Sequence, residues 1–252
     1  MKMQSIGFIG AGRITKIILQ AFTNKKVNFR KIVVFDINSE TTANLKQQFP
    51  AIEISDIEQV SSQNIVVIAL HPPVIMETLE KVIPYITDKT WVLSLAPKVK
   101  IAGIANKLNT APKIVRLIPN ATSVINEGYN PVCFSSGISR NEKAEMLGML
   151  SVLGETFEVP EEKLEAYAIV SAMAPTYFWF QWKKLANLGS EFGLDREEAY
   201  RAVYHSLAAA LDTLFKSGLK ENEVFDLIPV KPIGENEQEI ENIYDQKLKG
   251  LY

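Results

Sequence analysis

Short hydrophobic runs alternate with helix-like patterns over the first 160 residues of the chain. The run 65–70 is apolar throughout, as is typical of a parallel strand that is covered on both faces. In the segment 101–108, apolar residues recur three and four positions apart, which predicts an amphipathic helix. Strands are expected at 5–9, 32–35, 52–54, 64–70, 91–95, 114–118, 129–134 and 156–159, and a helix at 141–153. This alternation predicts an α/β fold built on a parallel sheet.

The strand signals stop after Pro160. From there to residue 217 the chain shows helical patterns, interrupted at Pro175 and after Gly193. A further amphipathic helix is expected in the C-terminal tail. We therefore predict two domains, residues 1–160 and residues 161–252, with the second one entirely α-helical.

The helix after Pro175 is aromatic on almost every face. Its rings are Tyr177, Phe178, Trp179, Phe180 and Trp182. A helix that is apolar all round has to be buried on all sides, and a helical domain of under ~100 residues rarely encloses one by itself. We therefore expect a second subunit to cover this helix, in a homodimer or a larger assembly of dimers.

The first expected strand turns directly into a helix through closely spaced glycines, Gly10 and Gly12. Gly10 permits a tight turn, and Gly12 lets the backbone approach a pyrophosphate without a Cβ in the way. The N-terminus of the helix adds free N–H groups and a positive dipole end. The third position of this fingerprint is Thr15 instead of Gly or Ala, so the context has to decide. With the alternating pattern, the motif predicts an N-terminal Rossmann-type doubly wound sheet followed by an all-α C-terminal dimerisation domain.

The second expected strand supplies that context. It ends at Asp36, 24 residues after Gly12 (36 − 12 = 24), near the offset at which an acid binds the hydroxyls of the adenosine ribose. An acid favours NAD because it repels a 2′-phosphate, whereas Arg13, Asn38 and Ser39 leave NADP open. A helix cap is the alternative role for Asp36, but Asn38 and Ser39 already serve the helix that follows. We expect NAD or NADP as the cofactor.

Composition favours small molecules over macromolecules as ligands. The chain is 47% hydrophobic and 22% charged, with a net charge of −2 and no block of like charges, so we expect neither nucleic acid nor a membrane as partner. The single cysteine, Cys133, is expected to be a buried thiol. The N-terminus lacks the pattern of a signal peptide, and no run approaches the ~20 apolar residues of a membrane span. We therefore expect a cytoplasmic protein.

A set of motifs extends this picture from the glycine corner to the C-terminal helices. They are 7–12, 69–72, 115–120, Gly128, 154–159, 171–177, 193–194 and 197–199. Together they resemble the 1-pyrroline-5-carboxylate reductases over nearly the whole chain, to about residue 220. The most specific of them is the stretch from Arg116 to Asn120, with its distance from the glycine corner.

The resemblance implies an enzyme that moves hydride from a reduced nicotinamide to the C=N carbon of 1-pyrroline-5-carboxylate, giving proline, in an intertwined dimer and without a metal. It also implies that the 119–120 turn lies beside the nicotinamide and that the 71–72 turn forms one side of the cofactor site. The expected catalytic residues are Asn120, His71, Ser171 and Thr176. The expected cofactor-binding residues are Gly10, Ala11, Gly12, Arg13, Ile14, Asp36, Asn38, Ala69, Leu70, Pro72, Ala96 and Asn120.

Two of these residues have competing readings. His71 stands at a strand end, where its imidazole could donate to a bound group or relay a proton, or could be only a structural cap. Asn120 could bond the cofactor amide or only stabilise its turn.

Both expected substrate-binding segments depart from the family's pattern. Where the family has a Ser-Gly-Ser-Gly-Pro turn that holds the substrate carboxylate, residues 171–175 are Ser-Ala-Met-Ala-Pro. The family's Ser-Pro-Gly-Gly-Thr-Thr loop corresponds to 227–234, which has no threonine. Two alternatives therefore stay open: a related NAD(P)-dependent dehydrogenase or imine reductase acting on a different small acid, and a non-catalytic dinucleotide-binding regulatory protein.

Overall fold

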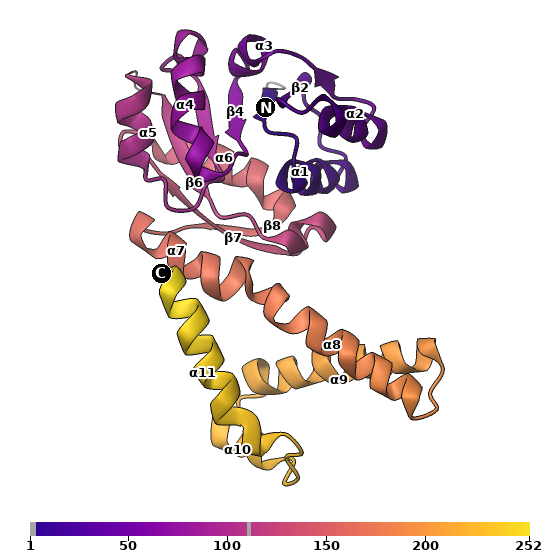
Figure 1. Cartoon of the computed structure of the whole chain (residues 1–252). Helices are drawn as coiled ribbons and strands as arrows, with labels where there is room; N and C mark the ends of the chain where they lie inside the picture. The colour runs from indigo at the N-terminus through magenta and orange to yellow at the C-terminus, as the bar shows by residue number, and fades with distance from the viewer. Residues whose placement is uncertain (1–3, 110–111) are drawn as a thin grey trace. The chain divides into compact units, whose positions relative to one another are not determined.

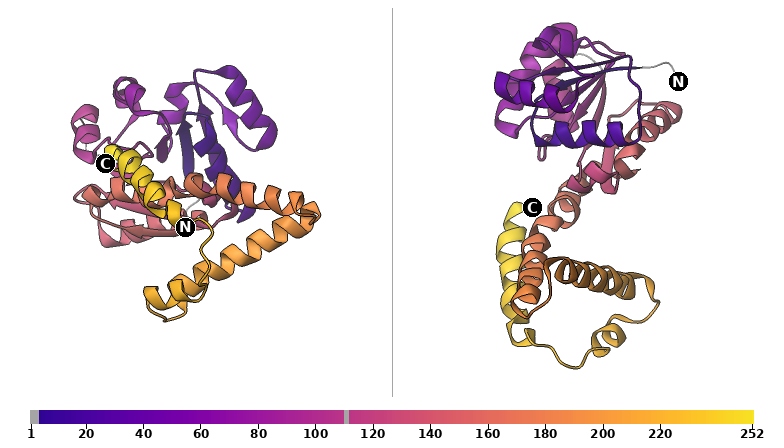
Figure 2. Two further views of the ribbon diagram at one scale, coloured as in Figure 1. Left: turned by 60° about the horizontal axis from the view of Figure 1, so that its bottom comes forward. Right: turned by 90° about the vertical axis from the view of Figure 1, so that its right-hand side faces the viewer.

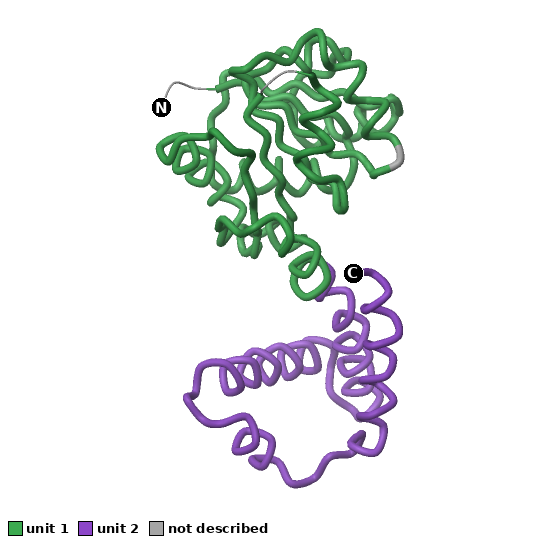
Figure 3. The backbone as a smooth tube through the Cα atoms, turned by 90° about the vertical axis from the view of Figure 1, so that its left-hand side faces the viewer, with its two compact units in different colours: residues 1–172 green, residues 173–252 purple. Residues whose placement is uncertain are grey.

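A computed structural model describes residues 4–109 and 112–252 of the chain. The chain divides into two compact units, Met1–Ala172 and Met173–Tyr252 (Figure 3). The first unit thus continues past Pro160. The assignment of residues 1–160 to the cofactor and 161–252 to substrate and dimerisation concerns function, and it stays a prediction.

The first unit is built on one sheet, which has eight strands in the described part of the chain. The strands are β1 (Ser5–Ile9), β2 (Lys31–Phe35), β3 (Glu53–Ile54), β4 (Ile65–Ile68), β5 (Trp91–Ser94), β6 (Lys113–Leu117), β7 (Gly128–Phe134) and β8 (Gly154–Glu158). Their order is β3-β2-β1-β4-β5-β6-β7-β8. Neighbours from β3 to β6 pair in parallel, β7 runs antiparallel to β6, and β8 is parallel to β7. The order reverses between β1 and β4, which confirms the doubly wound sheet.

Helices cover both faces of this sheet (Figure 1). They are α1 (Arg13–Asn24), α2 (Ser39–Gln48), α3 (Ile57–Ser61), α4 (Pro72–Val82), α5 (Ile101–Leu108), α6 (Arg140–Leu150) and α7 (Leu164–Tyr167). Residues of α1, α2 and α6 form one hydrophobic core with Phe8 and its same-face neighbours. Residues of α3, α4 and α5 form a second core on the opposite face, with Ile9. Successive strand residues thus point into different cores, as the period of two in a strand requires.

The sequence pattern located these elements closely. The weakest expected strand, 52–54, is the two-residue edge strand β3, and the expected helix at 141–153 is α6 followed by a 3₁₀ turn at Ser151–Leu153. Cys133 is buried, as expected, and burial raises the pKa of its thiol to about 12. Within the described residues, no helix is both long and apolar enough to span a bilayer.

The second unit consists of helices: α8 (Ala174–Glu191), α9 (Arg196–Lys216), α10 (Glu221–Asp226) and α11 (Glu237–Leu248). The long helices α8 and α9 follow each other through a short connection (Figure 2). Pro175 lies in the first turn of α8, where a missing N–H costs nothing, so it begins a helix. A π-helical turn, Ala168–Ala172, precedes it in the first unit.

The second unit buries little apolar surface within the single chain. Among its described residues, the buried apolar side chains are Ala186 and Ala199. By contrast, Trp179 and Phe180 on α8 are 49% and 67% exposed. The expectation that the aromatic helix is enclosed is therefore not met by this chain's own residues, and enclosure by a second subunit stays a prediction.

Candidate functional site

The carboxyl ends of β1, β2 and β4 meet at the glycine corner. Gly10 has a φ of +106°, and its N–H donates to the carbonyl of Phe35 at 2.8 Å. The N–H of Ala69 donates to the carbonyl of Ile9 at 2.9 Å. A Cβ on Gly10 would lie 2.5 Å from the carbonyl oxygen of Ala69. Both the backbone conformation and the space therefore require glycine at this position.

The N-terminus of α1 is open and has no acidic residue in its first turn. Gly12 is the N-cap residue, without a side-chain cap bond. A Cβ built on Gly12 meets no atom within 4 Å, so the space in front of the helix is free. Arg13 is exposed beside it, and Ile14 is half-buried. Free N–H groups, a positive dipole end and open space suit a pyrophosphate, so these residues fit a dinucleotide.

Thr15 explains the departure of the fingerprint from its usual third position. The side chain is fully buried, and its hydroxyl donates to the carbonyl of Gly10 at 2.6 Å. The hydroxyl thus satisfies a carbonyl of the tight turn, and no polar group is left unpaired. A threonine is therefore compatible with the glycine turn, although the third position of the fingerprint is usually Gly or Ala.

Asp36 joins the end of β2 to the glycine corner. One carboxylate oxygen, Oδ2, accepts the N–H of Ala11 at 2.7 Å, and Oδ1 accepts the N–H of Asn38 at 2.9 Å. Asn38 caps α2, because its Oδ1 accepts the N–H groups of Glu40 and Thr41 at 3.0 and 3.1 Å. The capping role thus falls to Asn38, as expected from the sequence. Each carboxylate oxygen of Asp36 keeps a lone pair for a ribose hydroxyl.

The ends of β4 and β5 border the other side of the corner. Leu70 and Pro72 are half-buried, and Ala96 is buried. His71 is exposed and occupies the N-cap position of α4, but its side chain makes no cap bond there. The structure therefore gives His71 no capping role, while its contact with a cofactor stays a prediction.

Asn120 and Ser171 meet after the end of β6. The Nδ2 amide of Asn120 donates to the carbonyl and to the Oγ of Ser171, both at 3.3 Å. The Oδ1 oxygen accepts the N–H and the hydroxyl of Thr122 at 3.1 and 3.0 Å. Asn120 therefore stabilises its own turn and holds Ser171 at the same time. Thr176 belongs to the second unit, where its hydroxyl donates to the carbonyl of Met173 at 2.7 Å.

Arg116 begins the most specific of the sequence motifs, but the sequence alone predicts no role for it. The side chain is almost fully buried and forms ion pairs with Glu161 and Glu165. The signal was a charged residue inside the apolar run 114–118. A buried charge requires a partner, but the sequence does not show which carboxylates supply it.

Comparisons with known proteins identify similar sequences and folds. Residues 5–98 match the family described as "NADP oxidoreductase coenzyme F420-dependent". Pyrroline-5-carboxylate reductase 2 of Bacillus subtilis is 22% identical over 250 residues, covering 98% of this chain and 89% of that protein. The human pyrroline-5-carboxylate reductase 2 is 26% identical over 219 residues, covering 84% of this chain and 68% of that protein.

The fold is shared with solved structures as well. The crystal structure of Plasmodium falciparum pyrroline carboxylate reductase with NADP bound matches with a TM-score of 0.82 at 19% identity, covering 100% of this chain and 95% of that one. The glycine corner, the acid after β2 and the matches along the chain agree on one assignment. The chain is an NAD(P)-dependent oxidoreductase whose cofactor is NAD or NADP, and it is similar to the pyrroline-5-carboxylate reductases along nearly its whole length.

Proposed function

We propose that the protein reduces 1-pyrroline-5-carboxylate to proline with NADH or NADPH. Hydride adds to the carbon of the C=N bond, the nitrogen gains a proton, and the nicotinamide is oxidised. The reaction needs neither a metal nor a nucleophile from the protein, so positioning of the two reactants supplies most of the catalysis. The names of the sequence relatives support this substrate.

The observation that carries the proposal is the place of the Asn120–Ser171 contact. A dinucleotide crosses the sheet where the strand order reverses, here between β1 and β4. Asp36 after β2 takes the adenosine side, so the nicotinamide extends toward β4, β5 and β6. Asn120 follows β6 and donates two hydrogen bonds to Ser171, which supports a role for the Ser171 hydroxyl beside a nicotinamide that extends in this direction.

The proposed roles follow from this direction. Cofactor binding falls to Gly10, Ala11, Gly12, Arg13, Ile14, Asp36, Asn38, Ala69, Leu70, Pro72, Ala96 and Asn120. Substrate handling falls to Asn120, His71, Ser171 and Thr176. A second candidate function is reduction of a different small imino or oxo acid, which the alanines flanking Met173 in the 171–175 turn favour.

Oxidation of NADH and NADPH by the purified protein, with and without 1-pyrroline-5-carboxylate, tests the proposal. Rapid oxidation that depends on this imine supports it. Tight cofactor binding without turnover removes this substrate and directs a screen to other imines and oxo acids. If no substrate in that screen gives turnover, a non-catalytic regulatory role replaces the proposal.

Asn120→Ala is expected to lower turnover roughly tenfold, more than it lowers cofactor affinity, because the variant loses the contacts that hold Ser171. Steady-state kinetics and NADH titration measure the two effects. Thr122→Val is the control, since it removes the hydroxyl's bonds to Asn120 Oδ1 and to the carbonyl of Glu127 and leaves the Ser171 contact in place. Wild-type turnover in Asn120→Ala removes this residue from the proposed site.

We also propose that the second unit forms a homodimer. Its exposed rings include Phe180 and Phe192, at 67% and 81% exposure, and large exposed apolar surface marks sites of protein interaction. A second copy of the chain is the occupant that fits, because in a symmetric dimer the second unit of each copy covers that of the other.

Phe180→Glu is expected to shift the protein from dimer to monomer, because a charge then replaces a ring that the partner covers. Sedimentation velocity measures the shift. The control is Ile37→Glu, which introduces the same charge at a 94% exposed apolar residue of the first unit and should leave the assembly unchanged. A wild-type protein that sediments as a monomer contradicts the dimer proposal.

A further inference from the structure

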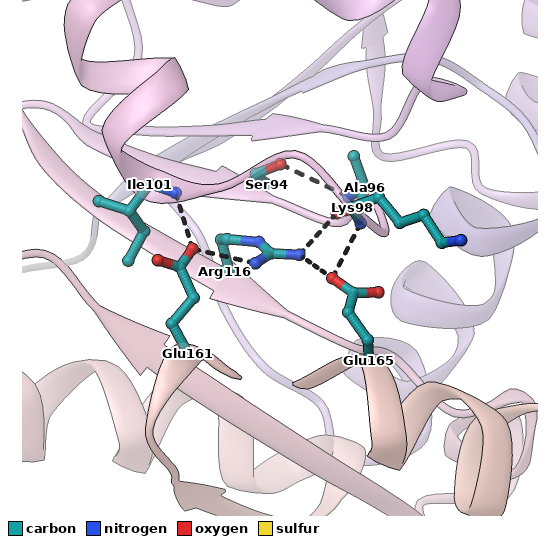
Figure 4. Close-up of polar contacts among 7 residues, drawn as sticks. All are labelled: Ser94, Ala96, Lys98, Ile101, Arg116, Glu161 and Glu165. Atoms are coloured by element: carbon teal, nitrogen blue, oxygen red, sulfur yellow. Dashed lines mark hydrogen bonds and ion pairs between the residues drawn. The ribbon is translucent and has the colours of Figure 1, made fainter. Parts of the chain in front are cut away.

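Arg116 lies at the centre of a buried ion cluster (Figure 4). Its Nη1 donates to Oε1 of Glu161 at 2.9 Å, and its Nη2 donates to Oε1 of Glu165 at 2.7 Å. Nη2 also lies 3.4 Å from the carbonyl of Ala96, as a third and weaker partner. The side chain of Arg116 is 2% exposed, against 27% and 22% for the two glutamates. One guanidinium therefore joins β6 to two acids from the segment that follows β8.

The same two carboxylate oxygens also hold the backbone after β5. Oε1 of Glu165 accepts the N–H of Lys98 at 2.9 Å. Oε1 of Glu161 accepts the N–H of Ile101 at 2.7 Å. Three backbone groups of the segment 96–101 are thus connected to the Arg116 guanidinium. The Ala96 carbonyl contacts it directly, and the N–H groups of Lys98 and Ile101 each share a glutamate oxygen with it.

The 96–101 segment has few local bonds; one is the long contact from the Ala96 N–H to the Oγ of Ser94, at 3.4 Å. Pro97 has no N–H, and Lys98 has a φ of +63°, which costs free energy for a residue with a Cβ. Lys100, the N-cap residue of α5, makes no side-chain cap bond. Glu161 supplies the acceptor and the negative charge that the start of α5 otherwise lacks. Residues that lie far away in the sequence therefore supply much of the hydrogen bonding of this segment.

This segment lies where the nicotinamide half of the cofactor is expected. It follows β5, which is separated from β1 by β4 alone and lies on the side away from β2 and Asp36. Ala96, the first residue of the segment, is 1% exposed. The position of Ala96 therefore depends on its packing and on its contact with Arg116.

We propose that Arg116, Glu161 and Glu165 are positioning residues that hold the 96–101 segment against the nicotinamide half of the cofactor. The inference rests on the proposed cofactor orientation. The three side chains touch neither cofactor nor substrate; they act through the backbone of Ala96, Lys98 and Ile101.

Stability alone is a weak reason for this cluster. Buried ion pairs are often no more stabilising than apolar residues of the same volume. The Nε of Arg116 has no hydrogen-bond partner among the described residues, which is a further cost of keeping a guanidinium here. A role in setting the geometry of the 96–101 segment explains why charged residues occupy these three positions.

The test compares binding of NADH with binding of ADP-ribose, which has the adenosine and pyrophosphate but no nicotinamide. Glu165→Ala is expected to weaken NADH binding about tenfold, because the Lys98 N–H loses a charged acceptor. ADP-ribose affinity should stay within about twofold of wild type, since the glycine corner is untouched. Glu165→Gln keeps an acceptor oxygen but loses the charge, so its NADH affinity should fall about threefold, between the affinities of wild type and Glu165→Ala. The matched control is Glu158→Gln, which breaks an ion pair with Lys143 at the edge of the same sheet.

The outcomes separate this inference from the proposed function. If the wild-type protein binds neither NADH nor ADP-ribose, the proposed cofactor orientation is wrong, and this inference is wrong with it. Normal wild-type binding, together with equal losses for NADH and ADP-ribose in Glu165→Ala, overturns the positioning role alone. If Glu165→Ala does not fold, Glu165→Gln decides: NADH affinity lowered about threefold at unchanged ADP-ribose affinity supports the role. NADH affinity equal to that of Glu158→Gln contradicts it.

Discussion

Gly12→Asp is expected to abolish dinucleotide binding, with an affinity loss of about 100-fold or more. The added carboxylate stands at the N-terminus of α1, in the open space that suits the pyrophosphate. Its negative charge repels the phosphates, and its oxygen accepts the N–H groups that would otherwise bind them. Titration with NADH and NADPH, followed by nicotinamide fluorescence, measures the loss.

The same substitution should not weaken the fold. Gly12 has a φ of −73° and a ψ of −167°, in the extended region that any residue adopts. Aspartate is also among the best N-cap residues, so the free energy of unfolding should stay equal or rise by about 1 kcal/mol. Loss of binding with retained stability assigns the effect to the cofactor site.

Gly148→Asp is the matched control for that experiment. Gly148 lies in α6, where a Cβ also meets no atom within 4 Å. It introduces the same charge away from the glycine corner, so cofactor affinity should remain that of wild type. Unchanged NADH affinity in folded Gly12→Asp would refute the placement of the pyrophosphate at α1.

The pattern of apolar residues was sufficient to predict where the strands lie, because each strand has its own local signal, but it did not show that β7 runs antiparallel to β6. The glycine corner was also readable, since Gly10 and Gly12 stand at fixed positions between a strand and a helix. What local signals do not contain is the partner of a polar side chain. The bond from Thr15 to the Gly10 carbonyl depends on the folded geometry of the turn, and it explains the unusual third position only after that geometry is known.

The ion cluster of Arg116 shows the same limit over a longer range. Its partners Glu161 and Glu165 lie 45 and 49 residues further along the chain. An arginine inside an apolar strand predicts that some carboxylate pairs with it, but helical or strand spacing cannot identify that carboxylate. The division of the chain has a similar cause: the π-helical turn Ala168–Ala172 belongs to the first unit, whereas the strand signals end at Pro160.

Because of Asp36, we expect the protein to bind NADH about 100-fold more tightly than NADPH. Both carboxylate oxygens are held by backbone N–H groups, so the side chain cannot swing away from a 2′-phosphate. Glu40, in the first turn of α2, adds a second negative charge nearby in sequence. The residues between them, 37–39, are Ile-Asn-Ser and carry no positive charge to offset the two acids.

Ile37→Arg tests this preference at a residue that is 94% exposed and therefore unimportant for packing. Arginine pairs well with phosphate, so NADPH affinity should rise about tenfold while NADH affinity changes little. Ile37→Gln, which is polar but uncharged, should leave the ratio of the two dissociation constants unchanged. Because Asp36 keeps both of its backbone bonds in each variant, a change in that ratio reports on the charge beside the ribose and not on the shape of the turn. Wild-type protein that binds NADPH as tightly as NADH contradicts the preference, and it would mean that the exposed Arg13 offsets the charge of Asp36.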